Sequence, residues 1–406
     1  MKQGVQIVLF MILILIIYLF VTKGTDSKVR ANKHSSVNHT VSEDDLDTKE
    51  EETILEDTFN TYMNVLDFHE IQEILDENTN HSFSMKEYVQ QAVSGREGFS
   101  FAGLGSDAFG IIKEEAEQQK HIFFQLLTLA CIAGIFSNFS SLFKNSQVGE
   151  SSFYIVYLIM FSVLTVSYFS VAQLVKNTFE QLTAFMKVLL PTYFASMTFV
   201  TGITASIGLY EMTLLTISIA EMVIVKIALP MINIYFILSL ANRISKEDML
   251  SKFVETIEVV IRWGLKTMLG VVIGMHTIQS MVMPVAGQFK HTAVNKTVSA
   301  LPVLGELLGT VTETVLGAGL LIKNAIGAAG LIAIIAICVI PLIKVVVCNL
   351  IYRLSMTAAQ PISDKRIIEC MEGAVKASEL LIYTGCIGGI LFFFTIVIIT
   401  TFTGQV

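Results

Sequence analysis

Long apolar stretches separated by short polar segments dominate the chain after residue 120, and this pattern predicts membrane-crossing helices. A helix needs roughly 20 apolar residues to cross a bilayer. We therefore predict an all-α, polytopic membrane protein. The full crossings are expected at 121–143, at 152–175, at 207–240, in the helix that follows residue 263, at 327–350 and at 379–403.

Three segments of different character precede this membrane body. Residues 1–23 carry an apolar run between Lys2 and Lys23 and predict a signal peptide or an uncleaved signal anchor. Residues 24–52 are polar and acidic and predict a disordered tether. Residues 53–120 are predicted to be a small extracytoplasmic helical region, with helices over 53–77 and 84–93 and a glycine-rich loop over 95–110.

The stretch 297–330 is apolar but unlike a lipid-facing helix, because it contains Pro302, several glycines and charged side chains. Glu306, Thr310, Glu313 and Gly317 follow the spacing that places residues on one helical face. Charged groups and broken backbone at membrane depth normally face protein or water. We predict a re-entrant or amphipathic hairpin within the bundle. An interfacial helix lying flat on the membrane is the alternative.

An internal duplication is predicted from the alignment of the chain with itself at an offset of 111 residues. At this offset, Pro191 aligns with Pro302, Pro230 with Pro341, and Gly208 with Gly319. We assign residues 152–262 to repeat 1 and 263–376 to repeat 2. Residues 121–151 hold the first span and a loop, and 377–406 hold the final span and the C-terminus. The four prolines are candidate helix breaks.

Basic residues predict the topology of the two repeats. Clusters that include Arg243 and Arg353 follow the long apolar run of each repeat and are expected in the cytoplasm, on short amphipathic helices over 250–262 and 367–376. The repeats then have the same orientation. Both basic clusters can lie in the cytoplasm if 187–206 and 298–322 are re-entrant. This arrangement gives six full spans and a C-terminus outside. Three short crossings per repeat remain the alternative.

Composition narrows the functional classes. The chain is 53% hydrophobic with a mean hydropathy of +0.65, and acidic residues outnumber basic ones by more than two to one over 24–120. This balance argues against nucleic acid as a partner. The five cysteines form no CxxC pair, and neither a zinc motif nor a nucleotide-binding or hydrolase motif is present. We expect no enzymatic activity, no metal and no cofactor.

Ionisable residues inside the apolar segments are the candidate functional groups. Glu306, Glu313, Glu221 and Lys226 are predicted to form a polar path for a solute or ion. The alternative for Glu221 and Lys226 is packing against other polar groups, and Lys344 is expected to extend to the cytoplasmic interface. Residue 195 is alanine where 306 is glutamate, so a symmetric transport site is not expected.

Two segments resemble a known family. Residues 317–330, followed by Cys338, Pro341 and Lys344, are similar to stage III sporulation protein AE of endospore formers, as are Leu189-Leu190-Pro191-Thr-Tyr-Phe-Ala-Ser-Met and the Gly202 that follows. The resemblance covers about 120–403, and we find no specific motif of the family over 24–118. It assigns no catalytic residues.

The resemblance implies a multi-pass protein of the mother-cell membrane around the forespore. The N-terminal signal segment separately predicts that the acidic N-terminal region lies outside the cytoplasm. The resemblance also implies a permease-like part of a channel-like, secretion-like complex that links mother cell and forespore. Partners would be other membrane and ring-forming proteins of that complex, a secretion-type ATPase and the forespore protein stage II Q. Two hypotheses follow: a structural subunit needed for complex assembly or passage of small molecules, or a stand-alone small-solute or ion permease.

Overall fold

The computed structural model describes residues 68–78, 84–93, 102–140, 146–201, 203–243, 250–298 and 304–402. Within these ranges the side chains near several helix ends lie outside the description, including those of 280–298 and 304–316. All described residues belong to one compact unit, Leu55–Val406. The predictions for 1–23 and 24–52 lie outside the described residues.

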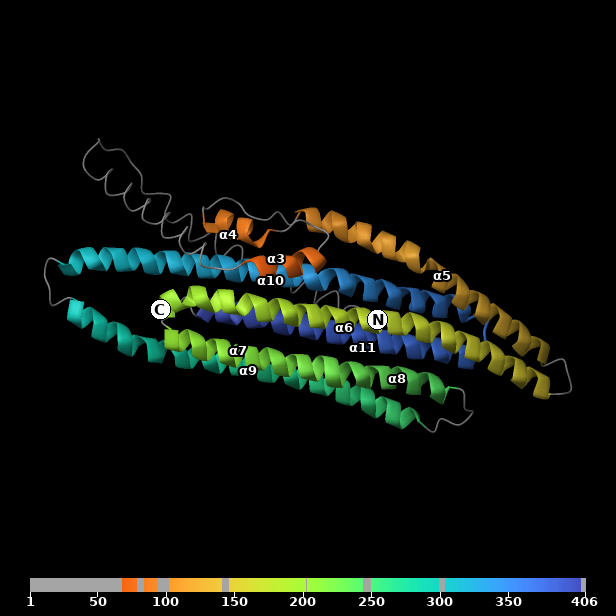
Figure 1. The fold of residues 1–406 in the computed structure, drawn as a ribbon. Coiled ribbons are helices and arrows are strands. Elements are labelled where there is room, and N and C mark those ends of the chain that lie inside the picture. The colour runs from red at the N-terminus through yellow and green to blue at the C-terminus, as the bar shows by residue number, and fades with distance from the viewer. Residues whose placement is uncertain are drawn as a thin grey trace. The chain divides into compact units, whose positions relative to one another are not determined.

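Every regular element among the described residues is helical, which confirms the all-α class (Figure 1). The elements are α3 (His69–Asn78), α4 (Met85–Val93), α5 (Ala102–Ser140), α6 (Ser146–Thr201), α7 (Ile203–Glu221), the π-helix η1 (Met222–Ala228), α8 (Leu229–Asn242), α9 (Ser251–Val298), α10 (Leu304–Ala359) and α11 (Lys365–Phe402).

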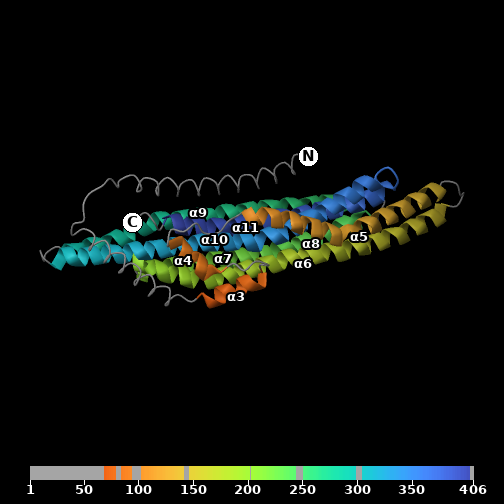
Figure 2. The same cartoon turned by 90° about the horizontal axis from the view of Figure 1, so that it is seen from above.

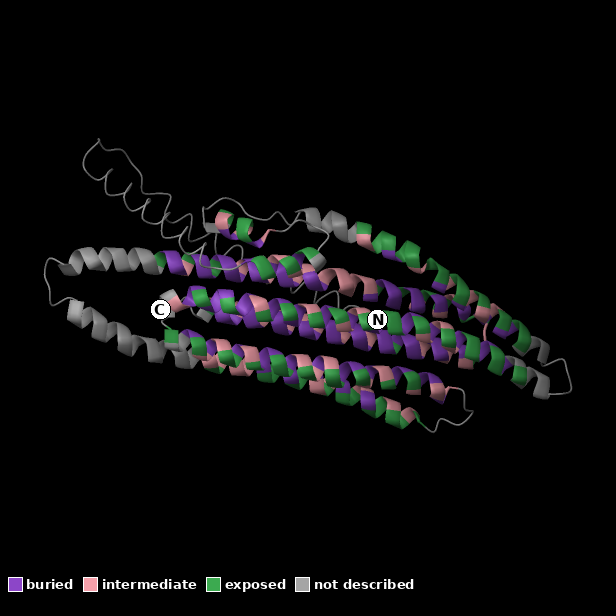
Figure 3. Ribbon diagram, in the orientation of Figure 1, coloured by how far each residue is buried: buried purple, intermediate pink, exposed green. Residues whose placement is uncertain are grey.

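The long helices lie side by side in a bundle in which α6, α10 and α11 all pack against one another (Figures 1 and 2). Helix α5 covers α6 and α10, while α7, α8 and α9 pack along α6 and α11. Apolar and aromatic side chains fill the interior, as where the rings of Tyr168 and Phe236 stack with centroids 3.9 Å apart. Buried residues continue along most of α11, the most buried of the candidate spans (Figure 3).

Three helix connections lie at the same end of the bundle, which we call the turn end. They are the connections from α5 to α6, from α8 to α9 and from α10 to α11 (Figure 1). Near this end, Gly134 of α5 lies against Ile362, the Arg366 guanidinium of α11 lies over the Phe153 ring of α6, and Arg243 at the end of α8 pairs with Glu369 of α11.

Five helical segments among the described residues are long and apolar enough to cross a membrane. They are Gly110–Phe136, Phe153–Thr198, Ser206–Asn242, Gly317–Ala359 and Lys365–Thr401. These segments confirm a multi-pass membrane protein by length and composition. The sixth predicted crossing lies in α9, which is not among the five.

The predicted re-entrant segments are replaced by continuous helices. Residues 187–201 continue α6, and residues 304–322 continue into the rest of α10. Each of these helices has 56 residues, which corresponds to about 84 Å. An apolar run too long for one crossing is therefore accommodated here by a helix much longer than a bilayer, rather than by a hairpin.

The prolines differ in their effect on the helices. Pro191 and Pro341 lie inside α6 and α10, which continue past them, so the breaks expected there are not observed. Pro230 is the second residue of α8, which follows η1 directly, and the N–H of Leu229 bonds to the Ile224 carbonyl in the π pattern. Proline lacks the N–H that an α-helix needs at this position. Pro302 lies outside the described residues.

The helix boundaries do not repeat at the predicted offset of 111. The connection at residue 202 would align with residue 313, which is inside α10, and the connection at 299–303 would align with 188–192, inside α6. The amphipathic segments 250–262 and 367–376 are the first turns of the long helices α9 and α11, not separate helices. Helix α4 matches the prediction for 84–93, whereas α5 begins within the predicted loop.

Candidate functional site

The structure describes the side chains of two of the four residues of the predicted polar path, Glu221 and Lys226. Glu221 forms a 2.9 Å ion pair with Lys187, which joins α7 to α6. Lys226 lies on η1 with its side chain exposed. Glu306 and Glu313 belong to α10, but their side chains lie outside the described part of the helix. A shared path through the four therefore stays a prediction.

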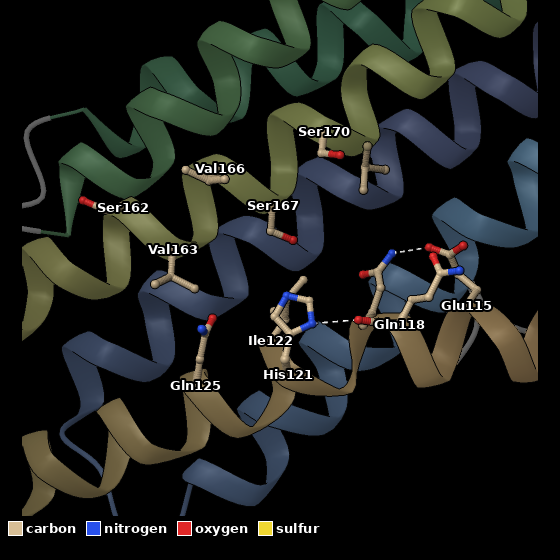
Figure 4. A pocket seen from close by; sticks show the side chains of 12 residues that line it. Glu115, Gln118, His121, Ile122, Gln125, Ser162, Val163, Val166, Ser167 and Ser170 are labelled. Atoms are coloured by element: carbon tan, nitrogen blue, oxygen red, sulfur yellow. Dashed lines mark hydrogen bonds between the residues drawn. The ribbon is translucent and has the colours of Figure 1, made fainter.

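The candidate functional site that the structure shows is a polar groove between α5 and α6, with a volume of about 560 Å³ (Figure 4). Helix α5 contributes a carboxylate, amides and an imidazole, and α6 contributes hydroxyls. The lining residues are Glu115, Gln118, Gln119, His121, Ile122, Gln125, Ser162, Val163, Val166, Ser167, Ser170 and Val171.

The buried carboxylate of Glu115 lies at one end of this groove (Figure 4). The Glu115 side chain is only 10% exposed, accepts a 2.5 Å hydrogen bond from Gln119 Nε2, and has its Oε2 3.7 Å from Lys344 Nζ on α10. The buried Gln119 Oε1 has no hydrogen-bond partner among the described residues. The ion pair balances the charge, so the groove presents mainly neutral hydrogen-bonding groups. Lys344, which was expected to extend to the cytoplasmic interface, pairs with this carboxylate, and its place relative to the membrane stays a prediction.

The wall of the groove is tied to the core of the bundle. Ser167 accepts a 2.6 Å hydrogen bond from the Tyr352 hydroxyl of α10, and both residues are buried. Asn349, one turn earlier on α10, donates to Ser378 Oγ of α11 at 2.6 Å. Interhelical hydrogen bonds of this kind hold helices together where apolar burial alone does not distinguish protein from lipid. Helix α6, which forms one wall of the groove, is thereby held against α10, and α10 is held against α11.

The groove escaped the sequence analysis because its α5 residues straddle the boundary placed at residue 120. Glu115, Gln118, Ile122 and Gln125 follow helical spacing, so they share one face of α5. This polar face next to the apolar residues 122–136 was the available signal. Dividing the chain by mean hydropathy assigned the two halves of one helix to different regions.

Four lysines on four helices lie at one level along the bundle, which we call the lysine level. Tyr168 of α6 donates to Asn233 of α8 at 3.2 Å, and Tyr352 of α10 donates to Ser167. Helices α8 and α10 run antiparallel to α6. Residues seven or eight positions before Asn233 or Tyr352 therefore lie about 12 Å further from the turn end than Asn233 and Tyr352 do. The lysines of this level are Lys176, Lys226, Lys344 and, through the bond from Tyr235 to Glu258, Lys266.

Between the turn end and the lysine level, the exposed faces of α6, α8, α9 and α10 carry many apolar side chains, whereas α5 exposes the polar residues Lys120, His121 and Gln125. Phe153 and Lys176 are separated by about 35 Å of helix, close to the roughly 30 Å thickness of a hydrocarbon core. The exposed apolar side chains of this zone are Ile155, Leu158, Ile159, Val166 and Phe169 on α6, Ile234 and Ile237 on α8, Val259, Val260 and Trp263 on α9, and Val346, Leu350 and Leu354 on α10.

A second cleft, of about 310 Å³, lies near the turn end between α8, α9 and α11. Arg243 pairs with Glu369 at 3.1 Å, and Lys376 pairs with Glu372 at 2.8 Å. Its acidic side chains are thus joined to basic neighbours. Among the described residues, no group of three or more His, Cys, Asp or Glu side chains could hold a metal ion.

The apolar helices and their polar interhelical contacts define a multi-pass, all-helical membrane protein. The stage III sporulation protein AE family matches residues 83–403, so the chain belongs to this family. It is 24% identical over 277 residues to stage III sporulation protein AE of Bacillus subtilis (strain 168), with 68% of this chain and 69% of that protein covered. No solved structure matches the chain.

Proposed function

We propose that this protein is an integral membrane subunit of a complex that links mother cell and forespore, and that its main task is to hold other subunits in place. Membership of the sporulation family supports a role in this process. The observation that carries the structural role is the length of α6 and α10, each with 56 residues. Less than half of such a helix fits within a bilayer, so the remainder is available for protein contacts.

The proposed topology follows from charge. Arg243, Arg353, Lys365 and Arg366 lie near the turn end, and basic residues favour the cytoplasmic side of a membrane. We therefore propose that the turn end lies in the mother-cell cytoplasm and the opposite half of the bundle outside it. The acidic N-terminal region is then extracytoplasmic. Ring-forming proteins, a secretion-type ATPase and the forespore protein stage II Q are the partners that the family resemblance suggests.

A permease role is the second candidate, and the polar groove favours it. A groove lined by amides, hydroxyls and a compensated carboxylate suits a small polar solute better than a lipid chain. Its volume is within the range of small-molecule sites, roughly 300–1,000 Å³. The groove and the carboxylates Glu306 and Glu313 are the parts of the chain on which transport would depend.

The two roles are separated by substitution in a sporulating host whose own gene is replaced. Two variants are informative: Glu115→Gln with Lys344→Gln, and Glu306→Gln with Glu313→Gln. Co-purification of complex subunits with the tagged full chain measures assembly, and heat-resistant spore counts measure development. We expect both to remain near the wild-type level if the role is structural. Normal assembly with few spores would instead support transport.

The structural role itself is tested by removing the chain. Deletion of the gene is expected to reduce co-purification of the remaining subunits with one another and to reduce spore counts. Expression of the wild-type chain should restore both. If the remaining subunits still co-purify at the wild-type level without this chain, it does not hold the complex together.

A further inference from the structure

The surface of α7 carries an apolar stripe on the far side of the lysine level from the turn end. Ile203, Ile207, Met212, Leu215 and Ile219 are between 41% and 66% exposed. We call these five residues the α7 stripe. They extend over about 24 Å of helix, and the exposed residues Met222, Lys226 and Ile227 of η1 lie between them and the exposed Ile234 and Ile237 of α8.

Lipid does not account well for this stripe. The apolar zone between the turn end and the lysine level already matches the thickness of one hydrocarbon core. Polar side chains on the exposed face of α6 follow directly: Gln173 bonds to Asn177 at 2.7 Å, and Lys176 pairs with Glu180 at 3.5 Å. Exposed groups of this kind belong in water or among lipid headgroups. The stripe begins beyond them.

We infer that the α7 stripe, together with Glu211, binds an amphipathic helix of a partner protein that carries a basic side chain facing Glu211. An apolar stripe on a helix is commonly covered by the apolar face of another helix, with anchors at helical spacing. Glu211 is exposed near the middle of the stripe and forms no ion pair with any residue that the structure describes. A Lys or Arg of the partner supplies the complementary charge.

The same charge disfavours a second copy of this chain as the occupant. A two-fold contact between identical α7 helices repeats each contact on both sides. It would bring two Glu211 carboxylates close to the centre of the interface, where like charges repel. A different protein with a basic residue avoids this repulsion. The inference rests on the proposed structural role, because it assumes that a subunit is held by this chain.

Photo-cross-linking of the full chain tests the inference. p-Benzoylphenylalanine is introduced in place of Leu215 or Ile207, and in place of Ile237 as the matched control, which is similarly exposed but lies between the turn end and the lysine level. In nanodiscs of phosphatidylethanolamine and phosphatidylglycerol, we expect lipid adducts at 237 and none at 207 or 215. Lipid adducts at 215 as abundant as those at 237 would overturn the inference.

In sporulating cells, positions 207 and 215 are expected to give an adduct with the same polypeptide, and position 237 is not. Mass spectrometry should place the adduct in an amphipathic helix that contains Lys or Arg. Glu211→Lys should lower the yield at 215 by about fivefold or more, since it replaces attraction by repulsion, whereas Glu211→Asp should not. An adduct between two copies of this chain, or a yield insensitive to Glu211→Lys, would refute the inference.

These outcomes are separate from those that test the proposed function. If subunits co-purify only when the chain is present but position 215 reacts with lipid, the structural role stands and the docking surface is wrong. If subunits co-purify without the chain while the cross-link still depends on Glu211, the docking surface stands and the structural role is wrong.

Discussion

The hydroxyl of Tyr352 donates a 2.6 Å hydrogen bond to the hydroxyl of Ser167, joining α10 to α6 across 185 residues of sequence. Both side chains are buried, and Ser167 lines the polar groove on its other side. This contact connects the packing of the core to the shape of the groove. It also fixes the register of α10 against α6, on which the lysine level depends.

Removal of this hydrogen bond gives the first prediction. Tyr352→Phe should lower the free energy of unfolding in detergent by about 0.5–1.5 kcal/mol, because a buried donor is lost and Ser167 loses its partner. Chemical denaturation followed by circular dichroism measures the change. Tyr154→Phe is the control, since Tyr154 is exposed on the same bundle. An equal effect of both substitutions would show that the hydrogen bond contributes little.

A second prediction concerns the approach of α5 to the turn between α10 and α11. A Cβ added at Gly134 would overlap the backbone carbonyl oxygen of Ile362, which cannot rotate away as a side chain can. Gly134→Ala should therefore cost about 1–3 kcal/mol of stability. At Gly264 a Cβ would meet nothing within 4 Å. Gly264→Ala should leave the thermal midpoint unchanged or raise it, because alanine favours helix over glycine by up to about 1 kcal/mol.

The ion pair between Arg353 and Glu379 provides a third prediction. The Glu379 side chain is only 15% exposed, whereas that of Arg353 is 43% exposed. Arg353→Met should destabilise the protein by about 1–3 kcal/mol, since it leaves a mostly buried carboxylate without its cation. Adding Glu379→Leu should recover most of the loss. Lys252→Met breaks an exposed pair with Glu255 and should change stability by less than about 1 kcal/mol.

The lysine level gives a fourth prediction, on the position of the membrane. Single cysteines at 226 and 237 are labelled with a membrane-impermeant maleimide in vesicles that contain the full chain, after replacement of the native cysteines. Lys226→Cys should react, because it lies at the predicted headgroup level, and Ile237→Cys should be protected by lipid. Faster labelling at 237 than at 226 would place the bilayer elsewhere along the bundle.

Several features of the fold followed from sequence because they depend on local pattern. Apolar periodicity predicted an all-α membrane protein, and the crossing expected at 207–240 lies within the candidate span Ser206–Asn242. The helix over 84–93 was also predicted. In each case the signal lies within the segment itself, since helix formation and the cost of exposing apolar groups are decided residue by residue.

The re-entrant hairpins failed for a reason that the local pattern does not contain. Pro191 suggested a break, yet α6 continues past it to Thr201. A proline in a helix removes one hydrogen bond, and the neighbouring helices of a bundle can stabilise the helix around it. The requirement that both basic clusters lie in the cytoplasm also led to a predicted hairpin where the chain instead forms a helix much longer than a bilayer.

The sequence by itself determined the class of this protein and the family to which it belongs, because hydropathy and short motifs are written along the chain. Only the tertiary structure decided which polar groups meet. The partnership of Lys344 with Glu115 and the common level of four lysines arise from the register of antiparallel helices, and that register is set by side-chain packing between residues far apart in sequence. No spacing within one helix encodes it, so the polar groove between α5 and α6 became visible only once the helices were placed together.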